Sequence, residues 1–292
     1  MKFKYFIKEM RVHHYIKNLL VFVPLACSGQ FFNHNKLISS VYAFLSFCFI
    51  SSAIYFINDI RDIEKDRKHP TKCNRPIAAG QISIKSAIVF TVFLIVFAAT
   101  FNVLCFNIYS SLLLLLYFAI NLGYSFGLKN IPLLDIAILV AGFLIRALYG
   151  SVVTNIQISN WLYLVIISVA FYLGLGKRRN ELTKQGNDTR KVIKKYPFAF
   201  LDNNMYMCMA LIFVFYALWT VDEKTIAVYH TNGLIWTVPV VMLIFMKYSL
   251  TVEGNSDGDP VEVLLHDKVL VGLCGLYLVI MFVLLYLPKV SV

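Results

Sequence analysis

The sequence has little charge and few residues that interrupt regular structure. Only 15% of its 292 residues are Asp, Glu, Lys or Arg, whereas 59% are hydrophobic and the mean hydropathy is +0.70. Soluble domains carry about 25% charged residues, so this composition excludes a water-soluble fold. With 14 Gly and 8 Pro the chain is not collagen-like or of low complexity, and the alternation typical of outer-membrane barrels is absent. We therefore expect an all-α polytopic membrane protein.

The chain also lacks C-x-x-C pairs and His-rich runs. Five of its 6 Cys lie in apolar stretches, and Cys73 lies in a polar loop. Neither a zinc site nor a disulfide framework is expected from this pattern. A removable signal peptide is not expected either, because no small-residue cleavage site ends a short apolar stretch near the N-terminus.

Apolar segments of about 20 residues, the length that crosses a bilayer as a helix, occur nine times. Their centres lie near Val21, Phe47, Val92, Leu114, Leu139, Val165, Leu211, Val241 and Val279. The first is short and contains Pro24, and the third and fourth nearly touch around Cys105, so eight spans are the alternative. We predict about nine transmembrane helices in a single domain over residues 1–292.

The distribution of basic residues orients these spans, because Lys and Arg are retained on the cytoplasmic side. With the N-terminus inside, the inside segments hold 23 of the 27 Lys and Arg, and the outside segments hold 3. This predicts a bacterial cytoplasmic-membrane protein with its N-terminus and polar loops inside and its C-terminus outside. Topology and anionic lipids account for the net charge of +11, so no nucleic-acid partner is implied.

Acidic residues are scarce, at 16, and their densest group is Asn58-Asp59-Ile60-Arg61-Asp62-Ile63-Glu64-Lys65-Asp66, directly after the second span. At about 100° per residue, Asp59, Asp62 and Asp66 share one helical face, with Asn58 one turn before Asp62. Clustered oxygen ligands without His or Cys suit Mg²⁺ that also binds substrate phosphates. The alternative is a solvated helix end whose acids pair with neighbouring basic residues, namely Arg61, Lys65 and Arg67.

The basic run 67–76 follows these acids and favours the metal interpretation. Lys and Arg donate charge-assisted hydrogen bonds to phosphate oxygens, which is the complement that a Mg²⁺-diphosphate requires. Arg67, Lys72 and Arg75 are the candidates for this contact.

The pattern N-D-x-x-D-x-x-x-D, followed by a basic loop ending in Arg75-Pro76, resembles the UbiA superfamily of intramembrane prenyltransferases. The resemblance implies a helical bundle around a central cavity with a cytoplasmic cap, in which Asn58, Asp59, Asp62 and Asp66 hold Mg²⁺ and its diphosphate. The segment 124–129 resembles the tyrosine-lysine stretch after the superfamily's fourth span. Tyr124 and Lys129 are therefore substrate-binding candidates, although an interfacial anchor would have the same residues.

One departure from the superfamily is informative. Typical members carry a second D-x-x-x-D after the sixth span, where this chain has Gly176-Lys177-Arg178-Arg179-Asn180-Glu181. Fixed cations suit direct contact with phosphate better than binding of a second metal. Lys177 and Arg178 are therefore phosphate-binding candidates, and Glu181 is expected to hydrogen-bond a sugar or to orient Lys177.

With Arg11, the stretch 15–22 and the stretch 258–265, this basic block resembles the decaprenyl-phosphate phosphoribosyltransferase branch of the superfamily. The resemblance implies Mg²⁺-dependent transfer of the phosphoribosyl group of 5-phosphoribose 1-diphosphate (PRPP) to a polyprenyl phosphate, with release of diphosphate. The product would serve arabinose-containing envelope polymers. Lys17 and Asn18 join the substrate-binding candidates. No general base is needed, because a phosphate nucleophile is already anionic.

Arg146, in the fifth span, should face the protein interior. Structural pairing with an acid and binding of a substrate phosphate are equally open roles for this residue. Two other functions stay open. A conventional prenyltransferase would use a prenyl diphosphate and an aromatic or other acceptor, but the missing second motif argues against it. A transporter would carry charges along its spans, whereas here they cluster at one membrane edge.

Overall fold

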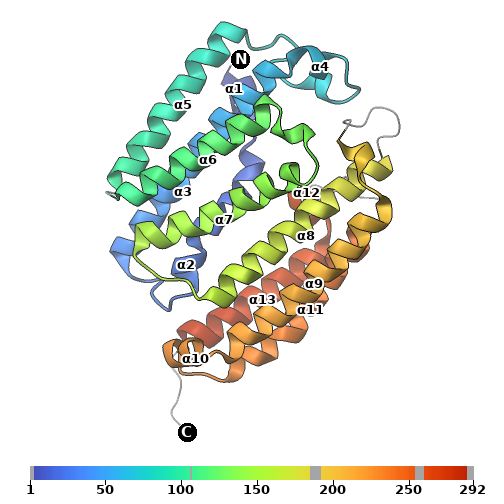
Figure 1. The fold of residues 1–292 in the computed structure, drawn as a ribbon. Coiled ribbons are helices and arrows are strands. Elements are labelled where there is room, and N and C mark those ends of the chain that lie inside the picture. Colours follow the sequence, from blue (N-terminus) through green and yellow to red (C-terminus); the bar gives the residue numbers. More distant parts are fainter. Residues whose placement is uncertain (1–2, 106, 185–191, 254–259, 288–292) are drawn as a thin grey trace. The chain divides into compact units, whose positions relative to one another are not determined.

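The computed structural model describes residues 3–105, 107–184, 192–253 and 260–287. These residues form helices and turns, without a β-strand among them, which confirms the all-α fold class (Figure 1). The helices are, in order, α1 (Phe3–Met10), η1 (Val12–Phe22), α2 (Val23–Ala26), α3 (His34–Arg61), α4 (Ile63–Arg67), η2 (Lys72–Asn74), α5 (Ile84–Leu104), α6 (Ile108–Phe126), η3 (Leu128–Asn130), α7 (Leu134–Thr154), α8 (Asn160–Lys184), η5 (Ile193–Lys195), α9 (Phe198–Val221), α10 (Glu223–Tyr229), η6 (Gly233–Thr237), α11 (Val238–Glu253), α12 (Pro260–His266) and α13 (Lys268–Tyr286).

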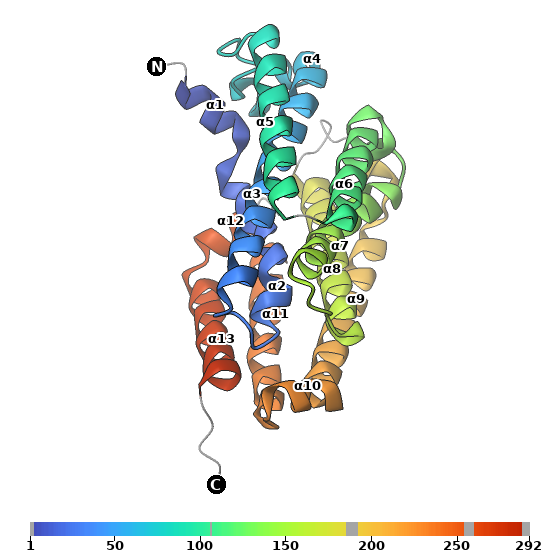
Figure 2. The same ribbon diagram turned by 90° about the vertical axis from the view of Figure 1, so that its left-hand side faces the viewer.

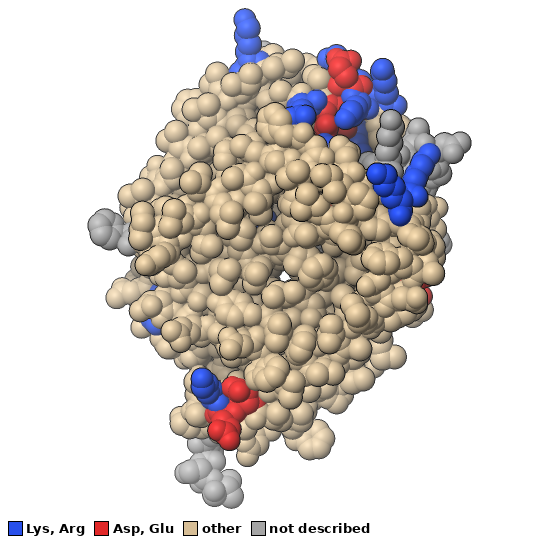
Figure 3. Space-filling model, in the orientation of Figure 1, with Lys and Arg blue, Asp and Glu red and all other residues tan. Residues whose placement is uncertain are grey.

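Eight helical segments of the described chain are long and apolar enough to cross a membrane. They are α3, α5, α6, α7, α8, α9, η6 with α11, and α13. The face seen in Figure 3 is accordingly uncharged apart from small patches, and α5 exposes large apolar side chains such as Val89, Phe93 and Phe97. A surface of this kind belongs against lipid, so the chain is an integral membrane protein.

The structure does not confirm the ninth expected span. The segment around Val21 forms the 3₁₀ helix η1 followed by the short α2, instead of one continuous α-helix. Pro24 has no N–H to continue an α-helical ladder, and its ring clashes with the preceding turn. A 3₁₀ helix rises about 2 Å per residue, so the 11 residues of η1 with α2 still approach the roughly 30 Å of a hydrocarbon core. Nine crossings therefore stay a prediction.

The chain divides into two compact units. Unit 1 comprises Met1–Leu25, Phe31–Ile138 and Ile145–Ile156, and unit 2 comprises Ala26–Gln30, Leu139–Leu144 and Gln157–Val292. The single domain, the central cavity and the cytoplasmic cap stay predictions, and each unit is described by itself.

In unit 1, α3 packs along α5 and against η1 and α6, and α1 lies against the C-terminal half of α3 (Figures 1 and 2). The ring of Phe47 contacts those of Tyr117 and Tyr149, with centroids 5.0 and 4.8 Å apart. Gly150 allows η1 to approach α7 closely, because a Cβ there would lie 2.0 Å from the Val21 carbonyl oxygen. This contact holds the N-terminal segment η1 against α7.

In unit 2, α8 packs along α9, and α11 packs between α9 and α13. The Tyr216 hydroxyl lies 2.6 Å from the Thr237 hydroxyl and 3.1 Å from that of Tyr277, which ties α9, η6 and α13 together. Helix α8 continues from its apolar segment through Lys177 to Lys184, so the basic block extends the same helix.

Candidate active site

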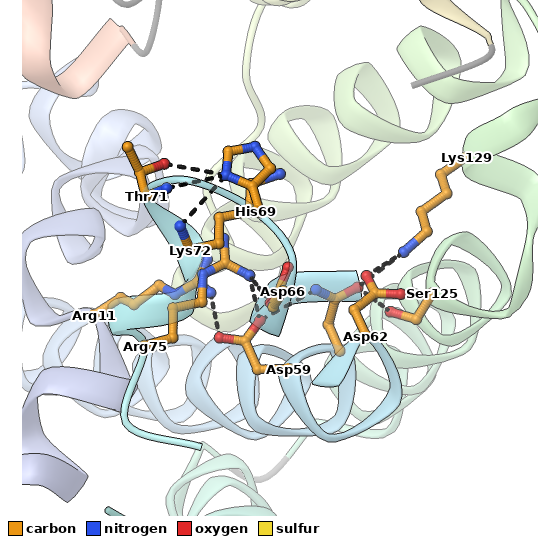
Figure 4. A network of polar contacts seen from close by, with 11 residues as sticks. Arg11, Asp59, Asp62, Asp66, His69, Thr71, Lys72, Arg75, Ser125 and Lys129 are labelled. Carbon is orange, nitrogen blue, oxygen red and sulfur yellow. Dashed lines mark hydrogen bonds and ion pairs between the residues drawn. The ribbon is translucent and has the colours of Figure 1, made fainter. Parts of the chain in front are cut away.

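The acidic motif spans the junction between α3 and α4. Helix α3 ends at Arg61, and Asp62 stands between the two helices. Backbone hydrogen bonds from the Asp62 N–H to the Asn58 carbonyl and from the Asp66 N–H to the Asp62 carbonyl, 2.9 and 2.8 Å long, keep the turn helical. The helical spacing expected from the sequence is therefore present, but the side chains form two groups, which one hydrogen bond of 3.3 Å from Asn58 Nδ2 to Asp59 Oδ1 connects (Figure 4).

The first group joins Asp59 and Asp66 through Arg75, and Arg11 also bonds Asp59. Asp59 is 1% exposed, and its Oδ2 accepts a 2.5 Å hydrogen bond from Arg11 Nη2. Arg75 Nη1 donates to Asp59 Oδ1 at 3.0 Å and to Asp66 Oδ2 at 2.6 Å. Arg11 adopts a left-handed backbone conformation, with φ of 53°, and its guanidinium stacks 4.6 Å from the Tyr55 ring centroid. Strained backbone of this kind at a polar site is typical of functional residues.

The second group contains Asp62 and Asn58. Lys129 Nζ lies 2.5 Å from Asp62 Oδ2 and 3.5 Å from Asn58 Oδ1. The Ser125 hydroxyl donates to the same Asn58 oxygen at 3.4 Å. Lys129, on η3, is buried, and Tyr124, in the last turn of α6, is half-buried. The structure thus brings Lys129 from the expected tyrosine-lysine stretch into direct contact with the motif.

A third acid, Glu9 at the end of α1, completes the first group. Glu9 is 1% exposed, and its carboxyl lies beside the Asp59 carboxylate. Neither of its oxygens has a hydrogen-bond donor among the described residues. Burial and the neighbouring Asp59 raise the pKa of Glu9 to about 8, because both disfavour its ionised form. Sequence reasoning missed Glu9, since a single acid outside the motif gives no spacing signal.

The basic loop contributes unequally to these groups. Arg75 bridges two motif acids, whereas Arg67 is half-exposed and bonds Glu64 at 3.1 Å and the Ala78 carbonyl at 3.2 Å. The backbone N–H of Lys72 donates to His69 Nδ1 at 3.4 Å. The acids therefore do pair with basic residues, as the alternative interpretation expected, but Arg11, Arg75 and Lys129 are the partners in place of Arg61 and Lys65.

Two further candidates in unit 1 bond to each other. Arg146 is buried, and its Nε donates to Asn18 Oδ1 at 2.7 Å while its Nη2 donates to the Tyr117 hydroxyl at 2.7 Å. The guanidinium also lies 4.8 Å from the Tyr117 ring centroid. Arg146 faces the interior, as expected for a charge in a span. Lys17, the neighbour of Asn18 on η1, is half-buried.

The basic block of unit 2 is also organised by ion pairs. Arg178 is 1% exposed, and its Nη1 lies 2.7 Å from Glu181 Oε2, so Glu181 orients Arg178. The prediction had Glu181 either hydrogen-bond a sugar or orient Lys177, which is half-buried on the same helix. Arg179, not singled out from the sequence, bonds Asp202 at 2.6 Å. Of the stretch 258–265, Gly258 and Asp259 lie outside the described residues.

The donor set of unit 1 fits a hard divalent cation. Asn58, Asp59, Asp62 and Asp66 present oxygen ligands within two adjacent turns, as Mg²⁺ requires. Within the described ranges no three His, Cys, Asp or Glu side chains converge as a ready-made cage, because Arg and Lys occupy the carboxylates. Mg²⁺ commonly completes its shell with water and substrate phosphate, so such a cage is not needed.

Comparisons with known proteins show the family and the fold of this chain. Residues 21–259 match the UbiA prenyltransferase family. The decaprenyl-phosphate phosphoribosyltransferase of Corynebacterium glutamicum is 36% identical over 90% of this chain and 81% of its own, and that of Mycolicibacterium smegmatis is 33% identical over 90% and 87%. A UbiA homolog from Archaeoglobus fulgidus bound to GPP and Mg²⁺ shares the fold, with a TM-score of 0.71 and 16% identity, over 96% of this chain and 99% of its own.

The matched segment contains the acidic motif, Arg75, Lys129 and the basic block of α8. Together with the eight apolar helices, the match shows that the chain belongs to the UbiA prenyltransferase family of membrane transferases.

Proposed function

We propose that this protein transfers the 5-phosphoribosyl group of PRPP to a polyprenyl phosphate and releases diphosphate. The observation that carries the proposal is the 36% identity, over 90% of the chain, to a decaprenyl-phosphate phosphoribosyltransferase. The basic block at Lys177 and Arg178 supports it, because a donor with two phosphorylated positions and a phosphorylated acceptor bring more anionic groups than a prenyl diphosphate alone. The product would feed arabinose-containing envelope polymers.

A divalent cation, which we propose is Mg²⁺, would be held by Asn58, Asp59, Asp62 and Asp66. When bound, it would neutralise charge on the leaving diphosphate and orient it. The A. fulgidus structure holds Mg²⁺ with GPP, which supports a metal-diphosphate role for the shared fold.

The chain's own cations are placed to serve the leaving group. Arg11, Arg75 and Lys129 each bond a motif acid now, at 2.5 to 3.0 Å. When a metal takes over the carboxylates, these donors can turn to phosphate oxygens, which a guanidinium binds in a bidentate manner. Arg67 and Lys72, on the same loop, are proposed as further diphosphate contacts.

In the reaction itself, the C1–O bond to diphosphate breaks and the electron pair leaves on the diphosphate oxygen. An oxygen of the lipid phosphate forms the new bond to C1. Because that oxygen is already anionic, no proton has to be removed, and no residue is assigned as a base. Developing charge on the diphosphate is what Arg11, Arg75 and Lys129 would stabilise.

The 5-phosphate of the sugar and the phosphate of the lipid need other binding residues. We assign Lys177, Arg178 and Lys17 to the sugar and lipid phosphates, Tyr124 to substrate contact, and Glu181 to orienting Arg178 at 2.7 Å. The Asn18–Arg146 hydrogen bond favours the structural alternative for both residues.

The test is conversion of ribose-labelled PRPP. Membranes containing the protein, supplied with polyprenyl phosphate and Mg²⁺, should form an organic-extractable lipid that keeps the ribose label. Charge reversal at Lys177 or Arg178 should remove that product by placing repulsion beside an anionic substrate. A protein that ignores PRPP and instead joins a prenyl diphosphate to an aromatic acceptor would disprove the proposal.

A further inference from the structure

The N-terminal helix α1 brings a buried carboxyl to the acidic motif. The Phe6 ring on α1 packs against Phe56 and Phe90, with ring centroids 6.3 and 4.7 Å away, and Lys8 Nζ donates to the Asn74 carbonyl at 3.4 Å. The Ser52 hydroxyl donates to the Met10 carbonyl at 3.0 Å. These contacts hold the last turn of α1 on α3 and the basic loop, and Glu9 is placed by them.

The protein alone offsets the burial of Glu9 only in part, through the nearby charges of Arg11 and Arg75. A carboxylate removed from water without donors costs several kcal/mol in free energy, and Glu9 has none for either oxygen among the described residues. Its neighbour Asp59 is itself an acceptor that Arg11 and Arg75 already bond. Two carboxyls can share a hydrogen bond only if one is protonated, so either a proton or a cation must lie between them.

A bound cation explains the placement better than a proton does. If Glu9 served only as a neutral structural side chain, proximity to Asp59 would not stabilise it. A Gln at this position would fill the same space without the free-energy cost of burying a carboxyl. A divalent cation between two carboxylates offsets both charges and inverts the penalty of their proximity. Glu9 also lies beside Asp59, the motif acid that both Arg11 and Arg75 bond, so it extends the donor set rather than forming a separate site.

We propose that Glu9 is a divalent-cation ligand, which together with Asp59 and a diphosphate oxygen binds metal at the edge of the acidic motif. This inference rests on the proposed metal-diphosphate site. Glu9 would then be an additional acidic ligand, from α1, in a chain that lacks the superfamily's second Asp motif. The remaining positions of the coordination shell belong to water and phosphate, which Mg²⁺ prefers to keep.

The test measures metal binding without turnover. Purified full-length protein in detergent is titrated with Mn²⁺, observed by electron paramagnetic resonance, in the presence and absence of inorganic diphosphate. Glu9→Gln should weaken Mn²⁺ binding at least about 10-fold, since loss of even an outer-shell partner costs roughly 10–100-fold. Glu64→Gln is the matched control, because Glu64 is a neighbouring acid whose side chain is 75% exposed, and it should bind Mn²⁺ as the wild type does.

A second variant decides the matter if Glu9→Gln does not fold. Glu9→Cys is smaller and uncharged, and a thiolate prefers soft metals, so it should lose Mn²⁺ affinity and gain Cd²⁺ affinity relative to the wild type. Glu64→Cys should show neither change. Wild-type Mn²⁺ affinity in Glu9→Gln, or unchanged Cd²⁺ affinity in Glu9→Cys, would overturn the proposal and leave Glu9 as a protonated partner of Asp59.

The outcome is separate from that of the proposed reaction. Neither PRPP nor polyprenyl phosphate enters the titration, so a failure of the PRPP assay leaves the Glu9 result intact. Loss of Mn²⁺ binding in Asp59→Asn with retention in Glu9→Gln would uphold the motif as the metal site and reject only the role of Glu9.

Discussion

Arg67 is the last residue of α4, and Arg75 directly follows η2. The two arginines differ in the acids that they bond. Arg75 bridges Asp59 and Asp66, whose side chains are 2% and 7% exposed, whereas Arg67 pairs with Glu64 at the surface. Arg75→Gln removes two charge-assisted hydrogen bonds, each worth about 1.5–3 kcal/mol. It leaves Asp66 without its 2.6 Å partner, while Asp59 keeps Arg11. Because breaking a buried ion pair costs about 3–5 kcal/mol, we expect a loss of roughly 3 kcal/mol in the free energy of unfolding.

The assay is reversible unfolding of the purified protein in mixed micelles of increasing SDS content, followed by circular dichroism. Arg67→Gln serves as the control and should change the free energy of unfolding by less than about 0.5 kcal/mol, as exposed pairs do. Mg²⁺ with diphosphate should restore part of the loss in Arg75→Gln, because the freed carboxylates then bind metal. Equal effects of the two substitutions would refute the assignment of Arg75 as the residue that holds the motif together.

Three further outcomes follow from the same structure. Asp59→Asn, Asp62→Asn and Asp66→Asn should each abolish turnover without loss of membrane insertion, because ligand charge disappears at constant volume; near-normal turnover in all three would remove the metal assignment. Gly150→Ala should destabilise the protein in the same SDS assay, because its Cβ would meet the Val21 carbonyl oxygen at 2.0 Å, whereas Gly272→Ala, with nothing within 4 Å, should not. Accessibility tags at the N-terminus and near Lys184 should report cytoplasm and a C-terminal tag the opposite side; both termini on one side would rule out nine spans.

The membrane class and the positions of the long apolar helices could be predicted from the amino-acid sequence alone. Hydrophobic runs of membrane length leave few choices, because an unsatisfied backbone in lipid is too costly and each run must form a helix. Local spacing also located the acidic motif, since residues three and four apart share a helical face whatever surrounds them. The sequence did not reveal that the first segment forms a 3₁₀ helix and a short α-helix, because mean apolarity does not register how Pro24 changes the backbone.

Which basic residue pairs with which acid depends on how the helices pack. Arg11 reaches Asp59 across 48 positions of the chain, and Lys129 reaches Asp62 across 67, and no pattern in the sequence encodes such pairs. Arg75 and Arg67 look equivalent in the loop, yet one is held against two buried carboxylates and the other lies at the surface. Glu9 had no motif to mark it, because its significance comes from burial beside Asp59. Burial and long-range proximity are properties of packing, so the chemistry of this site became visible only when the helices were assembled.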